Sequence, residues 1–215
     1  MPRKPLVHRG VSLACSARYE NEARGEGFLV VAGLDEVGCG ALCGPVVAGV
    51  VILGEGFDPD GLDDSKRLTE RQRQAQAERV RRDARACAIG AADPAEIDRL
   101  NILRATHLAM TRALAALGLR PDLVLIDGHR VVPGIGLPQR PIVKGDALSI
   151  SIAAASIVAK VHRDALMLES DSRYPGYGLA ENMGYGSEGH REALRRLGPS
   201  DFHRRSFHGT ERWLF

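Results

Sequence analysis

The chain has 215 residues, 44% of them apolar, which is enough for one domain with a full hydrophobic core. Its 29 Lys and Arg residues nearly balance 27 Asp and Glu residues, so the composition shows no strongly basic domain of the kind that often binds nucleic acid. The four cysteines form no CxxC pair, which argues against a zinc finger or a disulfide framework, and no apolar run is long enough to span a membrane.

The N-terminal segment, residues 1–26, is polar and weakly patterned, and we expect it to form an arm or a short helix outside the core. It begins MPRKPLVHRG and lacks the apolar stretch of a secretory signal. These features favour a cytoplasmic protein. We also expect the protein to be monomeric and to make no contact with membranes.

The core is predicted to begin at Phe28. Two β-branched apolar runs, residues 28–34 and 45–53, are separated by a glycine-rich bend and predict neighbouring antiparallel strands. A charged amphipathic helix is expected at 68–85, and a third strand at 86–92.

The second half of the chain alternates helices and strands. Helical spacing of apolar residues predicts one helix over 94–117, followed by buried strands at 123–127 and 140–143 and a long alanine-rich helix at 149–169. Three strands followed by alternating helices and strands indicate an α/β domain, in which helices pack on a mixed sheet. From residue 188 onward we expect a helix and a basic end, HRRSF.

Four carboxylates follow the ends of predicted strands: Asp35, Glu36, Asp127 and Asp146. Adjacent strand residues face opposite sides, so we expect the chain to leave the strand at Glu36, which would let Asp35 and Glu36 face one site. Hard oxygen ligands at such an edge suit Mg²⁺ or Mn²⁺ better than zinc. Turn formation explains any one of these residues taken singly, whereas four repelling carboxylates together call for a cation.

Lysine is scarce in this chain, with 4 Lys against 25 Arg. An ammonium group coordinates oxygen differently from a planar guanidinium. The site geometry could therefore require lysine at Lys66, Lys144 and Lys160; the alternative is that codon usage left these lysines in place. Lys160 shares a helix face with Asp164, where we expect a structural ion pair. The glycine-rich bend leads into a strand where a dinucleotide-binding loop would need a helix, which excludes that function.

Several motifs in register resemble bacterial ribonuclease HII over about residues 28–207. The resemblance is carried, in family order, by AGLDEVGCGALCGPVVAGVVIL, DDSKRLTERQR, NILRATHLAM, LIDG, VKGDALSISIAAASIVAKVHRDALM, YPGYGLAENMGYGSEGH and HRRSF. It implies a ribonuclease H-like mixed sheet flanked by helices. The implied catalytic domain covers residues 27–187, and a helical, basic C-terminal extension covers residues 188–215.

The resemblance also implies roles for individual residues. Asp35, Glu36, Asp127 and Asp146 match catalytic ligands that would hold Mg²⁺ or Mn²⁺, as two ions when substrate is bound. Tyr185 matches a tyrosine that stacks on the sugar beside the ribonucleotide, and the bend formed by Gly38, Cys39 and Gly40 matches a loop whose backbone recognises the 2′-hydroxyl group. The candidates for phosphate contacts are Lys66, Lys144, Arg204 and Arg205.

The implied function is an endoribonuclease that cuts the RNA strand of RNA–DNA hybrids and nicks DNA 5′ of an embedded ribonucleotide, leaving 5′-phosphate and 3′-hydroxyl ends. One departure from the family is Cys39, which replaces the arginine of a Gly-Arg-Gly loop. Two alternatives follow: a hybrid-binding protein with weakened or lost turnover, and a related metal nuclease for another structured nucleic acid. All four carboxylates are present, which favours the active endoribonuclease.

Overall fold

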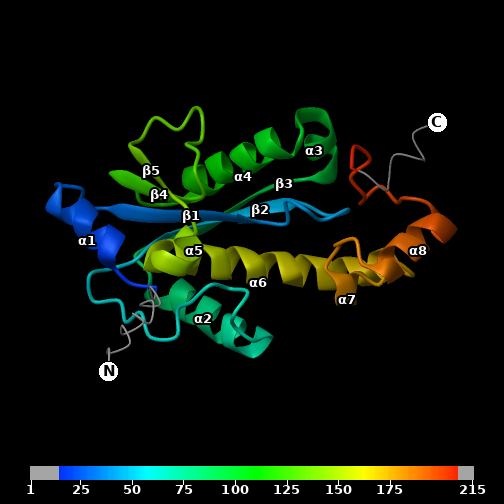
Figure 1. The fold of residues 1–215 in the computed structure, drawn as a ribbon, viewed down its shortest axis with the longest axis horizontal. Helices are drawn as coiled ribbons and strands as arrows, with labels where there is room; N and C mark the ends of the chain where they lie inside the picture. Colours follow the sequence, from blue (N-terminus) through cyan, green and yellow to red (C-terminus); the bar gives the residue numbers. More distant parts are fainter. Residues whose placement is uncertain (1–14, 208–215) are drawn as a thin grey trace, which may run out of the picture.

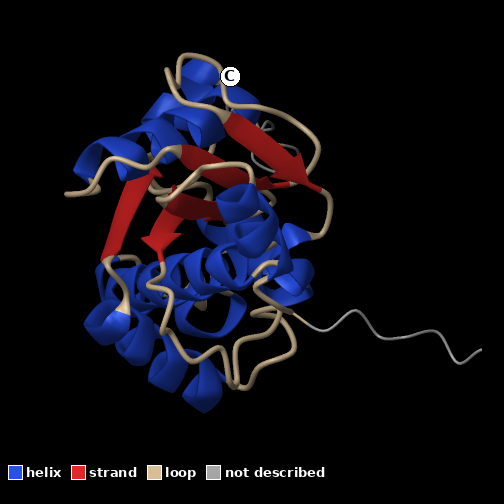
Figure 2. Ribbon diagram, turned by 90° about the vertical axis from the view of Figure 1, so that its left-hand side faces the viewer, coloured by secondary structure: helices blue, strands red, loops and turns tan. Residues whose placement is uncertain are grey.

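A computed structural model describes residues 15–207, in which five strands form a single mixed sheet (Figures 1 and 2). The strand order is β3-β2-β1-β4-β5; β1 and β2 pair antiparallel, as do β2 and β3, whereas β1, β4 and β5 are parallel. The strands are β1 (Val31–Val37), β2 (Val46–Ile52), β3 (Ala86–Ala92), β4 (Leu123–Asp127) and β5 (Gln139–Ile142). The expected mixed α/β sheet is confirmed.

Helices cover both faces of the sheet. They are α1 (Arg18–Gly25), α2 (Glu70–Asp83), α3 (Pro94–Leu100), α4 (Ile102–Ala116), α5 (Gly145–Leu148), α6 (Ile150–Arg173), α7 (Leu179–Asn182) and α8 (Glu188–Leu197). Helix α4 lies on one face and α6 on the other, with α2 packed outside α6 (Figure 1). Helices α7 and α8 lie near the C-terminal end of α6, on the right of Figure 1.

Alternating residues of the strands supply two hydrophobic cores, one on each face of the sheet. On β1, Ala32 and Leu34 join the core under α4, whereas Val31 joins the core under α6. Gly33 also faces α6, and a Cβ there would lie under 3.0 Å from backbone atoms of Ser151. This close contact between β1 and α6 fixes the helix directly behind the strand.

The helix expected over 94–117 is wrong in one respect, because the chain forms two helices, α3 and α4, that meet at Asn101. Asn101 has φ 68° and ψ 164°, outside the helical region. Its side chain accepts a hydrogen bond from the backbone N–H of Arg104 at 3.1 Å. Asparagine tolerates positive φ and is a favoured N-cap, so this residue ends one helix and begins the next.

The two ends of the chain are only partly described. Residues 1–14 of the expected arm and 208–215 of the expected extension lie outside the described residues. Within the arm, Glu20 on α1 is buried and accepts hydrogen bonds from Ser151, including one of 2.6 Å from its hydroxyl, which anchors α1 to the start of α6. The division at 26/27 and 187/188 stays a prediction. None of the described helices is both long and apolar enough to cross a membrane.

Candidate active site

The four predicted carboxylates lie around the ends of two parallel strands, β1 and β4. Leu34 pairs with Ile126 in the β1–β4 register, so Asp35 and Asp127 occupy the next positions on adjacent strands. Asp127 Oδ1 accepts a hydrogen bond of 2.7 Å from the backbone N–H of Gly145, the first residue of α5. Asp146 is the second residue of that helix, so the bond to Gly145 places Asp146 beside Asp127.

Asp35 and Glu36 reach this edge from opposite faces of the sheet, which corrects the expectation that the chain leaves the strand at Glu36. The β1–β2 pairing continues through Glu36 to Val37. Asp35 is hydrogen-bonded to Ser156 on α6, whereas Glu36 lies near Cys39, whose thiol contacts Thr106 on α4. The two carboxylates therefore flank the strand, and a site that uses both must extend around its end.

Burial and mutual repulsion disfavour the charged forms of three carboxylates. Burial, and then the charges of Glu36 and Asp127, raise the pKa of Asp35 well above its usual range. Burial and the charge of Asp127 raise the pKa of Glu36, and burial and the charge of Asp146 raise the pKa of Asp127. A divalent cation bound here would remove much of this repulsion, and carboxylate oxygens suit a hard ion.

The carboxylates surround a space wider than a single closed ion cage. Among residues 15–207, no three of them bring ligand oxygens within 4.8 Å of one another. This spacing is compatible with Mg²⁺, which keeps several of its waters and uses one or two direct carboxylate contacts. The donor set and its electrostatics therefore fit a hydrated divalent ion.

Lys66 extends over the same edge. Its Nζ lies 3.1 Å from Asp146 Oδ2 and 4.0 Å from Asp64, while the side chain stays 80% exposed. Partial burial lowers the pKa of Lys66, but the hydrogen bond and the charge of Asp146 outweigh that effect and raise it. The second expected lysine, Lys144, is exposed just before α5 and adopts a left-handed conformation with φ 59°.

A buried arginine that the sequence analysis missed supports the glycine bend. Gly38 has φ +92°, and a Cβ there would lie under 3.0 Å from the side chain of Arg163 on α6. Arg163 is fully buried and donates hydrogen bonds of 3.1 Å to Pro45 O and 3.3 Å to Cys43 O. An arginine in an alanine-rich helix gives no signal in the sequence that it will turn inward.

The structure does not support a phosphate contact for Arg204. Its side chain is fully buried and donates hydrogen bonds of 3.0 Å each to the carbonyl oxygens of Gly44 and Cys39. We therefore assign Arg204 to holding the glycine bend. Arg205 is exposed, and its backbone N–H donates a hydrogen bond to Asp98.

Cys39 and Tyr185 point in different directions. The Cys39 thiol lies 3.8 Å from Glu36 Oε1 and 3.4 Å from Thr106 Oγ1, and burial raises its pKa to about 11. The side chain at the centre of the bend therefore turns inward. Tyr185 is 38% exposed, with the guanidinium of Arg163 5.4 Å from its ring centre, so its ring is accessible.

A pocket of about 200 Å³ opens between Glu36 and Asp127. The pocket is also lined by His107 of α4 and by His129 and Arg130 after β4. The sequence did not mark these residues as candidates, because none of the histidines has a metal-binding spacing. The expected helix pair of Lys160 and Asp164 is confirmed at 2.7 Å.

The raised pKa of Asp35 predicts how pH affects stability in metal-free protein. The folded state holds this proton more tightly than the unfolded chain, in which the carboxyl titrates near 3.8. The stabilising contribution is therefore present at low pH and is lost as pH rises through the folded pKa. Asp35→Asn carries no such proton, so its Tm should exceed that of the wild type by more at about pH 8 than at about pH 5. Thermal unfolding in chelator tests this, and an equal difference at both pH values would contradict it.

Comparisons with known proteins agree on one family. A family model described as Ribonuclease HII matches residues 32–210. A Ribonuclease HII from Cereibacter sphaeroides is 53% identical over 197 residues, covering 92% of each chain, and one from Desulfitobacterium hafniense is 51% identical, covering 92% of this chain and 75% of the relative.

Solved structures share the fold. The ribonuclease H2 from Pyrococcus horikoshii OT3 has a TM-score of 0.71 at 26% identity, covering 86% of this chain and 96% of that one. A structure of Bst-RNase HIII in complex with Mn²⁺ has a TM-score of 0.66 at 18% identity, covering 88% of this chain and 70% of that one. The latter similarity supports the fold alone.

Proposed function

The chain belongs to the ribonuclease HII family, and we propose that this nuclease cuts the RNA strand of RNA–DNA hybrids and nicks duplex DNA on the 5′ side of an embedded ribonucleotide. The products would carry 5′-phosphate and 3′-hydroxyl ends. The observation that carries the proposal is the convergence of Asp35, Glu36, Asp127 and Asp146 on one edge of the sheet, where burial and repulsion call for a cation.

These four carboxylates would hold Mg²⁺ or Mn²⁺, as two ions when substrate is bound. Divalent ions held there would supply an activated water and stabilise the departing 3′-oxygen. The chain prepares its ligands before substrate arrives, because α5 fixes one oxygen of Asp127 through the N–H of Gly145. Lys66 is hydrogen-bonded to Asp146 and is mostly exposed, so it would meet a phosphate at this edge without reading sequence.

The glycine bend and Tyr185 would recognise the ribonucleotide. Buried Arg204 binds the carbonyl oxygen of Cys39 in the bend, and Arg163 and Arg204 bind those of Cys43 and Gly44 just after it, which would fix the shape of the bend without an arginine at position 39. A Cβ at Gly40 would meet no heavy atom within 4 Å, so a sugar could approach the backbone there. Arg163 lies against Gly38 and over the ring of Tyr185. It would therefore fix the position of the glycine bend relative to the tyrosine ring.

The remaining expectations stand as proposals. Lys144 and Arg205 are exposed and would contribute phosphate contacts further from the carboxylates. A monomeric state and a cytoplasmic location stay predictions.

Cleavage of three labelled substrates tests the proposed function. With Mg²⁺ or Mn²⁺, the protein should nick a duplex that contains one ribonucleotide on its 5′ side, cut the RNA strand of a hybrid, and leave an all-DNA duplex of the same sequence intact. Binding without cleavage would favour the hybrid-binding alternative. Cleavage of the all-DNA duplex would favour a nuclease with another substrate.

A further inference from the structure

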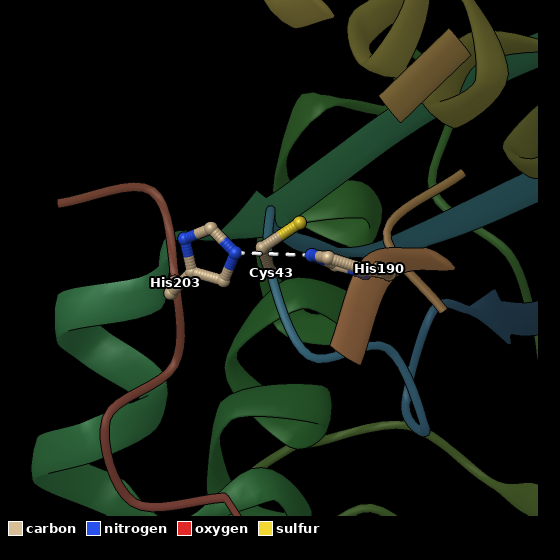
Figure 3. Close-up of side chains that lie close together, drawn as sticks. All are labelled: Cys43, His190 and His203. Carbon is tan, nitrogen blue, oxygen red and sulfur yellow. Dashed lines mark hydrogen bonds between the residues drawn. The ribbon is translucent and has the colours of Figure 1, made fainter. Parts of the chain in front are cut away.

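A second group of metal-binding side chains lies away from the carboxylates. Cys43 precedes β2, His190 is on α8, and His203 lies in the segment after α8 (Figure 3). All three are buried, and their ligand atoms lie within 4.8 Å of one another. We propose that they form a binding site for a borderline-soft divalent ion such as Zn²⁺, through Cys43 Sγ and the Nε2 atoms of both histidines.

Hydrogen bonds at the far side of each ring orient the two histidines. His190 Nδ1 lies 2.9 Å from the carbonyl oxygen of Tyr185, so it carries the proton and leaves a lone pair on Nε2. His203 Nδ1 lies 2.8 Å from Ser200 Oγ and accepts a hydrogen bond of 3.1 Å from the backbone N–H of Ser200, so His203 carries its proton on Nε2 and donates it to His190 Nε2. The two Nε2 atoms therefore face each other beside the thiol. Metal-bound histidines donate the N–H of the non-ligating nitrogen, as His190 does here; His203 would do so to Ser200 Oγ once its proton moved from Nε2 to Nδ1.

The separations need only small changes to hold an ion. The two Nε2 atoms are 3.0 Å apart, joined by a single shared proton. Two zinc–nitrogen bonds at a tetrahedral angle would set them at about 3.3 Å. Cys43 Sγ has no hydrogen-bond partner within residues 15–207. An ion would thus replace one hydrogen bond and gain a sulfur ligand that the fold otherwise leaves unused.

The surroundings select a thiophilic ion over Mg²⁺. Burial raises the pKa of Cys43 to about 12, against the opposing charges of Arg163 and Arg204. These guanidinium groups repel any cation but stabilise a thiolate, so the ion must bond to sulfur strongly enough to displace the thiol proton to solvent. Thiolate and imidazole ligands favour zinc or cobalt, whereas Mg²⁺ and Mn²⁺ prefer the carboxylates.

A surface groove lies next to one member of the cluster, His190. The groove has a volume of about 330 Å³ and is also lined by Tyr177, Glu181, Asn182 and Ser187. A bound ion would join three distant segments of the chain beneath Tyr185, and we therefore expect it to raise stability.

Cobalt titration of the full chain tests the site, because a thiolate bound to Co²⁺ absorbs in the near ultraviolet and carboxylate ligands do not. With excess Mg²⁺ present to occupy the carboxylates, Co²⁺ should produce this band, and Zn²⁺ should displace it. Residues that only orient a metal ligand are typically worth 10–100-fold in metal affinity, so Cys43→Ser, which removes a proposed direct ligand, should weaken binding by more than about 100-fold and abolish the band. Zn²⁺ should also raise the Tm of the wild type but not of Cys43→Ser.

The other cysteines provide matched controls. Cys39→Ser removes a thiol near Glu36, and Cys87→Ser removes one on β3, and both variants should keep the full cobalt band. His190→Gln should lose it, and Cys43→Ser carries the test if that histidine variant does not fold. A wild type without the band, or one whose band persists in Cys43→Ser, would show that the cluster is only a hydrogen-bonded histidine pair packed against a thiol.

Discussion

Asp35→Asn should reduce cleavage of a single-ribonucleotide duplex by at least about 100-fold at saturating Mg²⁺, while the protein remains folded. Asparagine has nearly the same shape as aspartate but lacks the charge that a metal ligand must carry. Loss of about 3 kcal/mol of the several that metal catalysis supplies corresponds to two decades at about 1.4 kcal/mol per decade. Initial rates measured with both variants over a range of Mg²⁺ concentrations would show the loss.

Asp164→Asn is the matched control for this experiment. This variant makes the same Asp-to-Asn change at a position on α6. Asp164 pairs with Lys160 there and is not one of the four carboxylates of the candidate site. Its rate should stay within about three-fold of the wild type, since Asp164 is not among the charges that act on Asp35, Glu36 or Asp127. If Asp35→Asn kept more than about a tenth of the wild-type rate, the assigned catalytic site would be wrong.

The sheet and the carboxylate edge could be predicted because both depend on local patterns. Apolar runs with β-branched residues marked the strands, and glycine after Leu34-Asp35-Glu36-Val37 marked the end of β1. A parallel strand that ends at Asp127 must bring that residue to the same edge as Asp35. Spacing along the chain therefore indicated where charges would gather, before any contact was known.

Features that depend on distant contacts were not predictable. Asn101 interrupts a run with unbroken helical spacing, and only its positive φ reveals the break. Arg204 looked like a surface cation in HRRSF, yet its partners are carbonyl groups about 160 residues earlier. Cys43 and His203 likewise meet through a β-bridge between segments that share no local pattern. Packing between distant segments decides whether such residues are buried, and neither composition nor periodicity carries information about that packing.

Gly33→Ala should lower the free energy of unfolding by about 3 kcal/mol or more, which is a large share of the ~5–15 kcal/mol typical of a domain. The added Cβ would lie under 3.0 Å from backbone atoms of both Ser151 and Ile152. Backbone cannot move aside as a side chain can, so β1 and α6 would have to separate. Urea unfolding of the two proteins gives the difference.

Gly118→Ala supplies the control, because a Cβ there meets nothing within 4 Å and the free energy of unfolding should change by no more than about 0.5 kcal/mol.

Gly33 lies two residues before Asp35, so its packing against α6 also affects the position of this carboxylate. Ser156, which is hydrogen-bonded to Asp35, is on the helix that Gly33 contacts. Any Gly33→Ala protein that folds should therefore cleave more slowly than Gly118→Ala. Equal unfolding midpoints for the two variants would mean that the sheet and α6 are not in the close contact that positions Asp35.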